Sequence, residues 1–200
     1  MKSNYIKLVE ALSKKIVKKI SFDVINPTSL IRYGLRPHTR SISWLAEQII
    51  SQHIKYYQNQ YNIEKFEESK TDISVWDFKI RFKNFPITLY INSKITNLHQ
   101  KKQRNDMSSI KKLYSFLQNN KNVKLLYLIF PFEFKGKLGN RIEFSNKTII
   151  GEYIKMKDFY LNPRNEHLQA FYDVENIERN YEDFIKLIYE KQSKGKKFLK

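Results

Sequence analysis

An aspartate, an asparagine and a lysine occupy positions at which two neighbouring strands can bring them together. Asp77 lies within one stretch of alternating residues, and Asn92 and Lys94 lie near the end of the next. Because the side chains of a strand alternate between its two faces, Asn92 and Lys94 are expected on one face and Ser93 on the other. Oxygen ligands that hold a divalent cation, beside a lysine that handles the attacking water, suit hydrolysis of a phosphodiester bond. Asp77 and Lys94 could instead form a cross-strand surface ion pair.

Two predicted strands position these residues. From Ile73 to Phe82, large apolar residues alternate with charged or smaller ones, which predicts a half-buried strand. A turn over residues 83–86 leads into a second strand, Ile87–Ile95. Together the two segments predict a β-hairpin.

Helices are predicted on both sides of this hairpin, together with more strands. The predicted helices cover residues 4–20, a segment from Thr39 or Ser41 to Ile54 that contains Glu47, a segment capped by Asn105 or Asp106 that runs to Leu117, and Tyr181–Gln192. The apolar run Val123–Phe132 predicts a central strand covered on both faces, and Arg141–Phe144 and Thr148–Ile154 predict shorter strands. This order predicts an α/β fold in one domain, residues 1–200, with a mixed central sheet flanked by helices.

The charge of the chain favours a nucleic-acid partner. Thirty-seven Lys and Arg against twenty Asp and Glu give a formal net charge of +17, which attracts polyanions. An AT-rich genome would explain lysine in place of arginine, but not the shortage of acidic residues. The chain has no cysteine, which excludes disulfides, thiolate zinc sites and a cysteine nucleophile, and its four histidines lack the spacing of a zinc site.

No segment has the composition of a membrane span or of a signal peptide. The longest apolar runs are far shorter than the 18 or so residues that a span requires, and lysines interrupt the N-terminal segment. We therefore expect a cytoplasmic protein that acts neither at a membrane nor on a small molecule.

The hairpin resembles the active-site motif of the PD-(D/E)xK nuclease superfamily, which includes many type II restriction endonucleases. Asp77 matches the first acid of that motif and Lys94 its lysine, whereas Asn92 stands where the family usually has Asp or Glu. The likeness extends in character over roughly residues 30–170, through the stretches Gly34–Pro37, Arg104–Asp106 and Asn162–Asn165. It implies a restriction-endonuclease-like core and Mg²⁺-dependent cleavage of double-stranded DNA at a short specific sequence.

The resemblance also implies a set of metal ligands. Many members carry a glutamate on the helix before the hairpin, which assigns Glu47 to the Mg²⁺ shell beside Asp77, with Asp72 as an alternative first acid. Asn92, which offers a neutral oxygen, or a nearby backbone carbonyl completes the shell. Lys94 is expected to orient or deprotonate the attacking water and to stabilise the developing charge.

Two further sets of residues are predicted to contact DNA. The basic residues suited to phosphates are Arg36, Arg40, Lys101, Lys102 and Arg104. The side chains of types that read base edges are Asn162, Arg164, Asn165 and Gln169. A solvated loop explains any single lysine of this set more simply than a phosphate contact, and helix capping or solvation explains Arg36 and Arg40 equally well. The base-reading types could instead form a polar turn.

Two other functions are compatible with the sequence. One is a basic DNA-binding module without catalysis, a reading that Asn92 supports. The other is a related nuclease that acts on RNA or on branched DNA. For a restriction enzyme, cutting both strands of a palindrome requires two active sites, which favours a homodimer.

Overall fold

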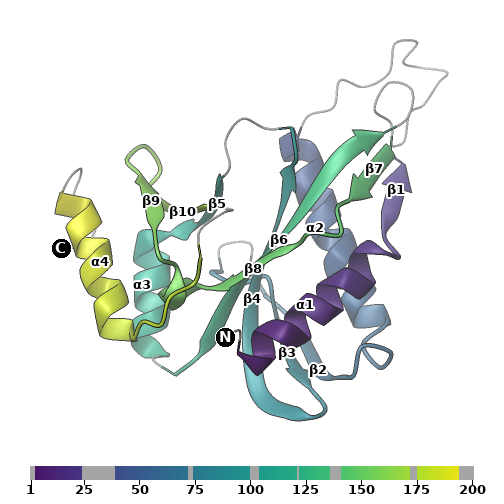
Figure 1. The fold of residues 1–200 in the computed structure, drawn as a ribbon, viewed down its shortest axis with the longest axis horizontal. Helices are drawn as coiled ribbons and strands as arrows, with labels where there is room; N and C mark the ends of the chain where they lie inside the picture. Colours follow the sequence, from purple (N-terminus) through teal and green to yellow (C-terminus); the bar gives the residue numbers. More distant parts are fainter. Residues whose placement is uncertain are drawn as a thin grey trace.

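A curled, mixed β-sheet flanked by helices is the centre of the computed structural model (Figure 1). The structure describes residues 3–23, 39–71, 74–99, 104–120, 122–135, 141–171 and 175–193. In these residues the sheet has the strand order β1-β7-β6-β4-β3-β2, and β8 also pairs with β6. Its strands are β1 (Ser21–Asp23), β2 (Ile63–Glu68), β3 (Phe78–Phe82), β4 (Phe85–Asn97), β6 (Lys124–Lys135), β7 (Arg141–Phe144) and β8 (Ile149–Glu152).

A smaller sheet and the helices complete the fold. The second sheet has the order β5-β10-β9, formed by β5 (Arg104–Ser109), β10 (His167–Phe171) and β9 (Phe159–Asn162). The helices are α1 (Asn4–Val17), α2 (Thr39–Tyr56), α3 (Ile110–Asn119) and α4 (Tyr181–Ser193), with a 3-10 turn at Tyr153–Lys155. The chain passes from β4 through β5 and α3 to β6, so β4 and β6 run parallel while the other pairs of the large sheet are antiparallel.

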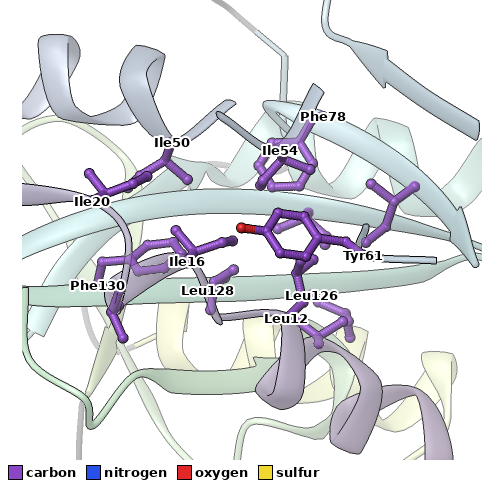
Figure 2. Packing of buried hydrophobic residues seen from close by; sticks show 14 of the residues in the cluster. Leu12, Ile16, Ile20, Ile50, Ile54, Tyr61, Phe78, Leu126, Leu128 and Phe130 are labelled. Atoms are coloured by element: carbon purple, nitrogen blue, oxygen red, sulfur yellow. The ribbon is translucent and has the colours of Figure 1, made fainter. Parts of the chain in front are cut away.

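The large sheet buries both of its faces, and β6 shows this most directly. Leu126, Leu128 and Phe130 belong to a core shared with α1 and α2, whereas Leu125 and Tyr127 belong to a second core shared with α3 and α4. Figure 2 shows the first of these cores, where side chains from α1 and α2 meet those of β6. An uninterrupted apolar run is therefore needed in β6, as expected of a central strand.

Helix α1 covers the sheet because its apolar residues fall on one stripe. Val9, Leu12 and Ile16 are almost fully buried, at intervals of three and four residues, while the lysines between them are exposed. On α2, Ile50 and Ile54 are buried in the same way, one turn after Glu47. Burial of this stripe fixes the rotation of α2, and hence the direction in which Glu47 points.

The predicted hairpin and central strand are confirmed, with one change that bears on the site. Strand β3 begins at Phe78, so Asp77 lies one residue before the strand and not inside it, and Asp72 lies outside the described residues. The backbone N–H of Asp77 still donates to the carbonyl of Ile91 at 2.8 Å. Beyond that bond β3 and β4 separate. The edge of β4 after Ile91 therefore faces side chains on this side instead of a neighbouring strand.

One other prediction is wrong. Neither Asn105 nor Asp106 caps a helix, because residues 104–109 form β5 and α3 begins at Ile110. Here antiparallel pairing between β5 and β10, far apart in the chain, overrides the local preference of polar residues for caps. Strand β10 belongs to the β9–β10 hairpin, and Asn162–Asn165 lie at its turn.

No helix in the described ranges is long and apolar enough to cross a membrane.

Candidate active site

Asp77 is fixed at the point where β3 and β4 separate. Its Oδ2 accepts the backbone N–H of Ser93 at 2.6 Å, and its own carbonyl accepts the N–H of Ser69 at 2.7 Å. Since β3 no longer pairs with β4 at Ser93, the Asp77 carboxylate accepts the Ser93 N–H that a carbonyl of a paired strand would otherwise accept. The side chain is 38% exposed, so this anchored carboxylate remains accessible to solvent.

Lys94 joins Asp77 to Glu47. Its Nζ lies 3.6 Å from Oδ2 of Asp77 and 3.5 Å from Oε2 of Glu47, and both the lysine and the glutamate are about one-fifth exposed. Glu47 reaches this point from α2, where it also accepts a hydrogen bond from the backbone of Ile95. The acid and lysine of the hairpin and the glutamate of the preceding helix are therefore brought together as the sequence predicts.

Burial changes the proton affinity of Glu47. Removal from water raises the pKa of Glu47 to about 7, and the negative charge of Asp77 adds to the increase, while the ammonium of Lys94 acts against it. Two carboxylates share one lysine here, so the site has an unbalanced negative charge when Glu47 is ionised. Such a site favours a cation.

A cleft of about 250 Å³ opens beside these residues. It is lined by Glu47, Gln48, Ser51, Gln52, Glu68, Ser69 and Asp77. Glu68, on β2, is a third acid in the cleft that the sequence did not single out, but its carboxylate is held by α2. Its Oε1 accepts Ser51 Oγ at 2.8 Å and Gln52 Nε2 at 3.0 Å, and Lys55 lies 3.3 Å from Oε2.

Asn92 lies close to the site in sequence but makes different contacts. Its side chain is 2% exposed, and its Nδ2 donates to the carbonyls of Val75 and Met107 at 3.1 and 3.0 Å. Within the described residues its Oδ1 is buried and accepts no hydrogen bond. Nothing in the sequence signals these contacts, because the two carbonyl partners lie 17 and 15 residues away along the chain.

Comparison with known proteins places the fold. No family model matches the chain, and no curated protein sequence matches it. Among solved structures, the chain is similar to the NlaIV restriction endonuclease with a TM-score of 0.56 and 13% identity, over 98% of this chain and 81% of the other. The chain has a restriction-endonuclease-like fold. At this identity the likeness shows the fold alone, so the chemistry has to be argued from the residues.

In this restriction-endonuclease-like fold, the available ligands suit a hard divalent cation. The described parts of the chain contain no group of three or more His, Cys, Asp or Glu side chains placed to hold a metal. Asp77 and Glu47 offer two carboxylates to a cation, whereas the Oδ1 of Asn92 is buried and Asn92 does not line the cleft. An oxygen-only set of this kind matches Mg²⁺, which retains water molecules and is often held by one or two carboxylates.

The residues predicted to read DNA bases lie on the second sheet, around Asp106, which the sequence analysis did not assign to DNA binding. Asp106 accepts hydrogen bonds from the side-chain amides of Asn165 and Gln169. The Oδ1 of Asn162 accepts the backbone N–H of Arg164 at 3.0 Å, and Arg164 is exposed at the hairpin turn. The structure thus gathers these residues on one exposed hairpin.

The residues predicted to contact phosphates are only partly described. Arg104 stacks its guanidinium 4.1 Å from the ring centre of Tyr160 on β9, beside the same hairpin. Arg36, Lys101 and Lys102 lie outside the described residues, as does the side chain of Arg40 in the first turn of α2. Asn105, next to Arg104, donates to the carbonyl of Ile95 at 3.2 Å, which connects β5 to the edge of β4 that carries the site.

Proposed function

We propose that the protein is a Mg²⁺-dependent endodeoxyribonuclease of the type II restriction kind, which hydrolyses double-stranded DNA at a short specific sequence. The observation that carries the proposal is the convergence of Lys94, Asp77 and Glu47 beside an open cleft. The restriction-endonuclease-like fold supports it. The three side chains also come from the helix and the hairpin to which the resemblance assigns the site.

The residues have complementary roles in the proposed reaction. Asp77 and Glu47 would hold Mg²⁺, with a backbone carbonyl as a further oxygen ligand. The metal, when bound, neutralises charge on the phosphate and lowers the pKa of bound water. Lys94 orients the attacking water or accepts its proton, and its positive charge stabilises the phosphorane-like transition state. The water oxygen forms a bond to phosphorus as the bond to the leaving sugar oxygen breaks.

The exposed hairpin of the second sheet is the proposed recognition surface. Asp106 holds the amides of Asn165 and Gln169 through one N–H each. Asn165 is exposed and retains a second N–H, and such an amide pairs with adenine in the major groove, whereas the Oε1 of Gln169 is buried beside it. Arg164 and Asn162 stand beside them, and Arg36, Arg40, Lys101, Lys102 and Arg104 are the proposed phosphate contacts. Two copies of the chain would supply one active site for each strand.

Cleavage of unmethylated phage DNA tests the proposal. Discrete bands are expected with Mg²⁺, and intact DNA with EDTA or with the variant Asp77→Ala. A matched control is Asp183→Ala on α4, whose partner Lys186 lies at the same 3.6 Å separation as Lys94 from Asp77. DNA that stays intact with every metal but is retarded in a gel would instead support the catalytically inactive binding module. Cleavage of RNA or branched DNA alone would support the other nuclease.

Replacement of the lysine separates catalysis from binding. Lys94→Ala is expected to lower the cleavage rate about 10²- to 10⁴-fold, because the water loses its general base or orienting group. DNA affinity without metal should change less than about twofold, since one partly buried ammonium contributes little to phosphate binding. Lys186→Ala is the control for loss of a lysine. Full cleavage by Lys94→Ala would refute the proposed role.

A further inference from the structure

Asn92 is held by contacts that only a hydrogen-bond donor can make. Its Nδ2 lies 3.1 Å from the carbonyl oxygen of Val75 and 3.0 Å from that of Met107. Backbone carbonyls only accept hydrogen bonds, so they fix the amide nitrogen in this position rather than the amide oxygen. A carboxylate in the same place would direct negative charge at two acceptors.

Both carbonyls belong to irregular backbone. Val75 lies in the bend before β3, outside any strand. Met107 lies at a bulge of β5, where the pairing with β10 passes from Ser108↔Leu168 to Asp106↔Gln169 and gives Met107 no partner. A buried carbonyl without a partner is unfavourable, and both residues are about 95% buried or more. Asn92 donates a hydrogen bond to both carbonyls.

We propose that Asn92 is a positioning residue, whose neutral amide ties the bend that carries Asp77 to strand β5. Val75 precedes Asp77 by two residues, so a fixed Val75 carbonyl restricts where the Asp77 carboxylate can lie. Strand β5 carries Arg104 and Asp106, so the same amide connects the second sheet to the active-site edge of β4. Asparagine is required here for its N–H groups, and an acid would not restore the site. The role in catalysis rests on the proposed nuclease function, whereas the contacts themselves can be tested without activity.

Thermal unfolding of variants in EDTA, without DNA, tests the contacts. Asn92→Asp is expected to lower Tm by about 5–10 °C, because a donor is replaced by an acceptor in a buried site. The matched control is Asn97→Asp on the same strand, whose oxygen accepts the N–H of His99 at 2.9 Å, a contact that a carboxylate keeps. It should melt within about 2 °C of wild type. If Asn92→Asp melts like wild type and gains more stability from Mg²⁺, Asn92 is a metal ligand and the proposal is wrong.

A local readout separates positioning from general loss of stability. Trp76, between Val75 and Asp77, packs edge-on against Tyr90 at 5.5 Å, and the chain has one other tryptophan, Trp44. In a Trp44→Phe background at 20 °C, Asn92→Ala is expected to shift the Trp76 emission to longer wavelength and to increase its quenching by iodide. The Mg²⁺ concentration for half-maximal binding should rise about tenfold. Unchanged emission and Mg²⁺ affinity in Asn92→Ala would overturn the proposal even if Asn92→Asp does not fold.

Discussion

The burial of Glu47 brings its pKa close to neutral pH. Its pKa is raised from 4.5 to about 7, so between these values the folded protein binds a proton that the unfolded chain has released. The free energy of unfolding therefore falls as pH rises through this window, by about 3 kcal/mol in total. This loss of stability, caused by ionising the buried Glu47, is fully present above about pH 7 and absent below about pH 4.5.

Replacing Glu47 should remove this dependence. Urea unfolding in EDTA is expected to show Glu47→Gln gaining stability over wild type, by about 3 kcal/mol between pH 5 and pH 8. Added Mg²⁺ should restore the stability of wild type above pH 7, because the ionised Glu47 carboxylate binds the ion. It should leave Glu47→Gln nearly unaffected, because the neutral amide binds Mg²⁺ much more weakly. Glu64→Gln, at an exposed carboxylate paired with Arg81, is the control and should follow the wild-type curve. Parallel curves for Glu47→Gln and wild type would show that Glu47 titrates normally.

At the scale of elements, the placement of α2 on β2 determines the site. Glu68, the last residue of β2, accepts hydrogen bonds from Ser51 and Gln52 and pairs with Lys55. These three residues lie on α2, one to two turns beyond Glu47. We expect Glu68→Ala to cost about 1–2 kcal/mol of stability and to raise the Mg²⁺ requirement for cleavage about tenfold, since α2 would hold Glu47 less firmly. Glu64→Ala, on the same strand but bonded to Arg81 within the sheet, should change neither. An equal effect of both variants would mean that β2, and not the docking of α2, is responsible.

The elements also show how far the sequence can predict this fold. The hairpin and β6 were predictable because their apolar periodicity is local, and this placed Asp77 and Lys94 on neighbouring strands. Strand β2 was missed because four of its six residues are charged, as on an edge strand that leaves one face in water. Strands β5 and β10 were missed because Arg104 pairs with Phe171, 67 residues away, and no local pattern encodes that partner. The contacts of Asn92 depend on the bulge in β5 and the bend at Val75, so its placement could not be foreseen either.

At the scale of the whole molecule, the charge of +17 sets how binding responds to salt. If six to ten phosphates are neutralised, the affinity of Asp77→Ala for duplex DNA in EDTA should fall about 10³- to 10⁵-fold between 50 and 200 mM salt. The fold predicts which charges matter. Arg164 lies at the turn of the exposed hairpin and Arg104 stacks beside it, whereas the exposed Lys7 lies on α1 and the exposed Lys18 directly follows that helix. Replacing both arginines with Gln should reduce the slope of log affinity against log salt by about 2, and replacing both lysines should leave it unchanged. The opposite result would place the DNA along α1, away from the second sheet. Binding that does not respond to salt would mean that the positive charge of this protein does not serve a nucleic-acid partner.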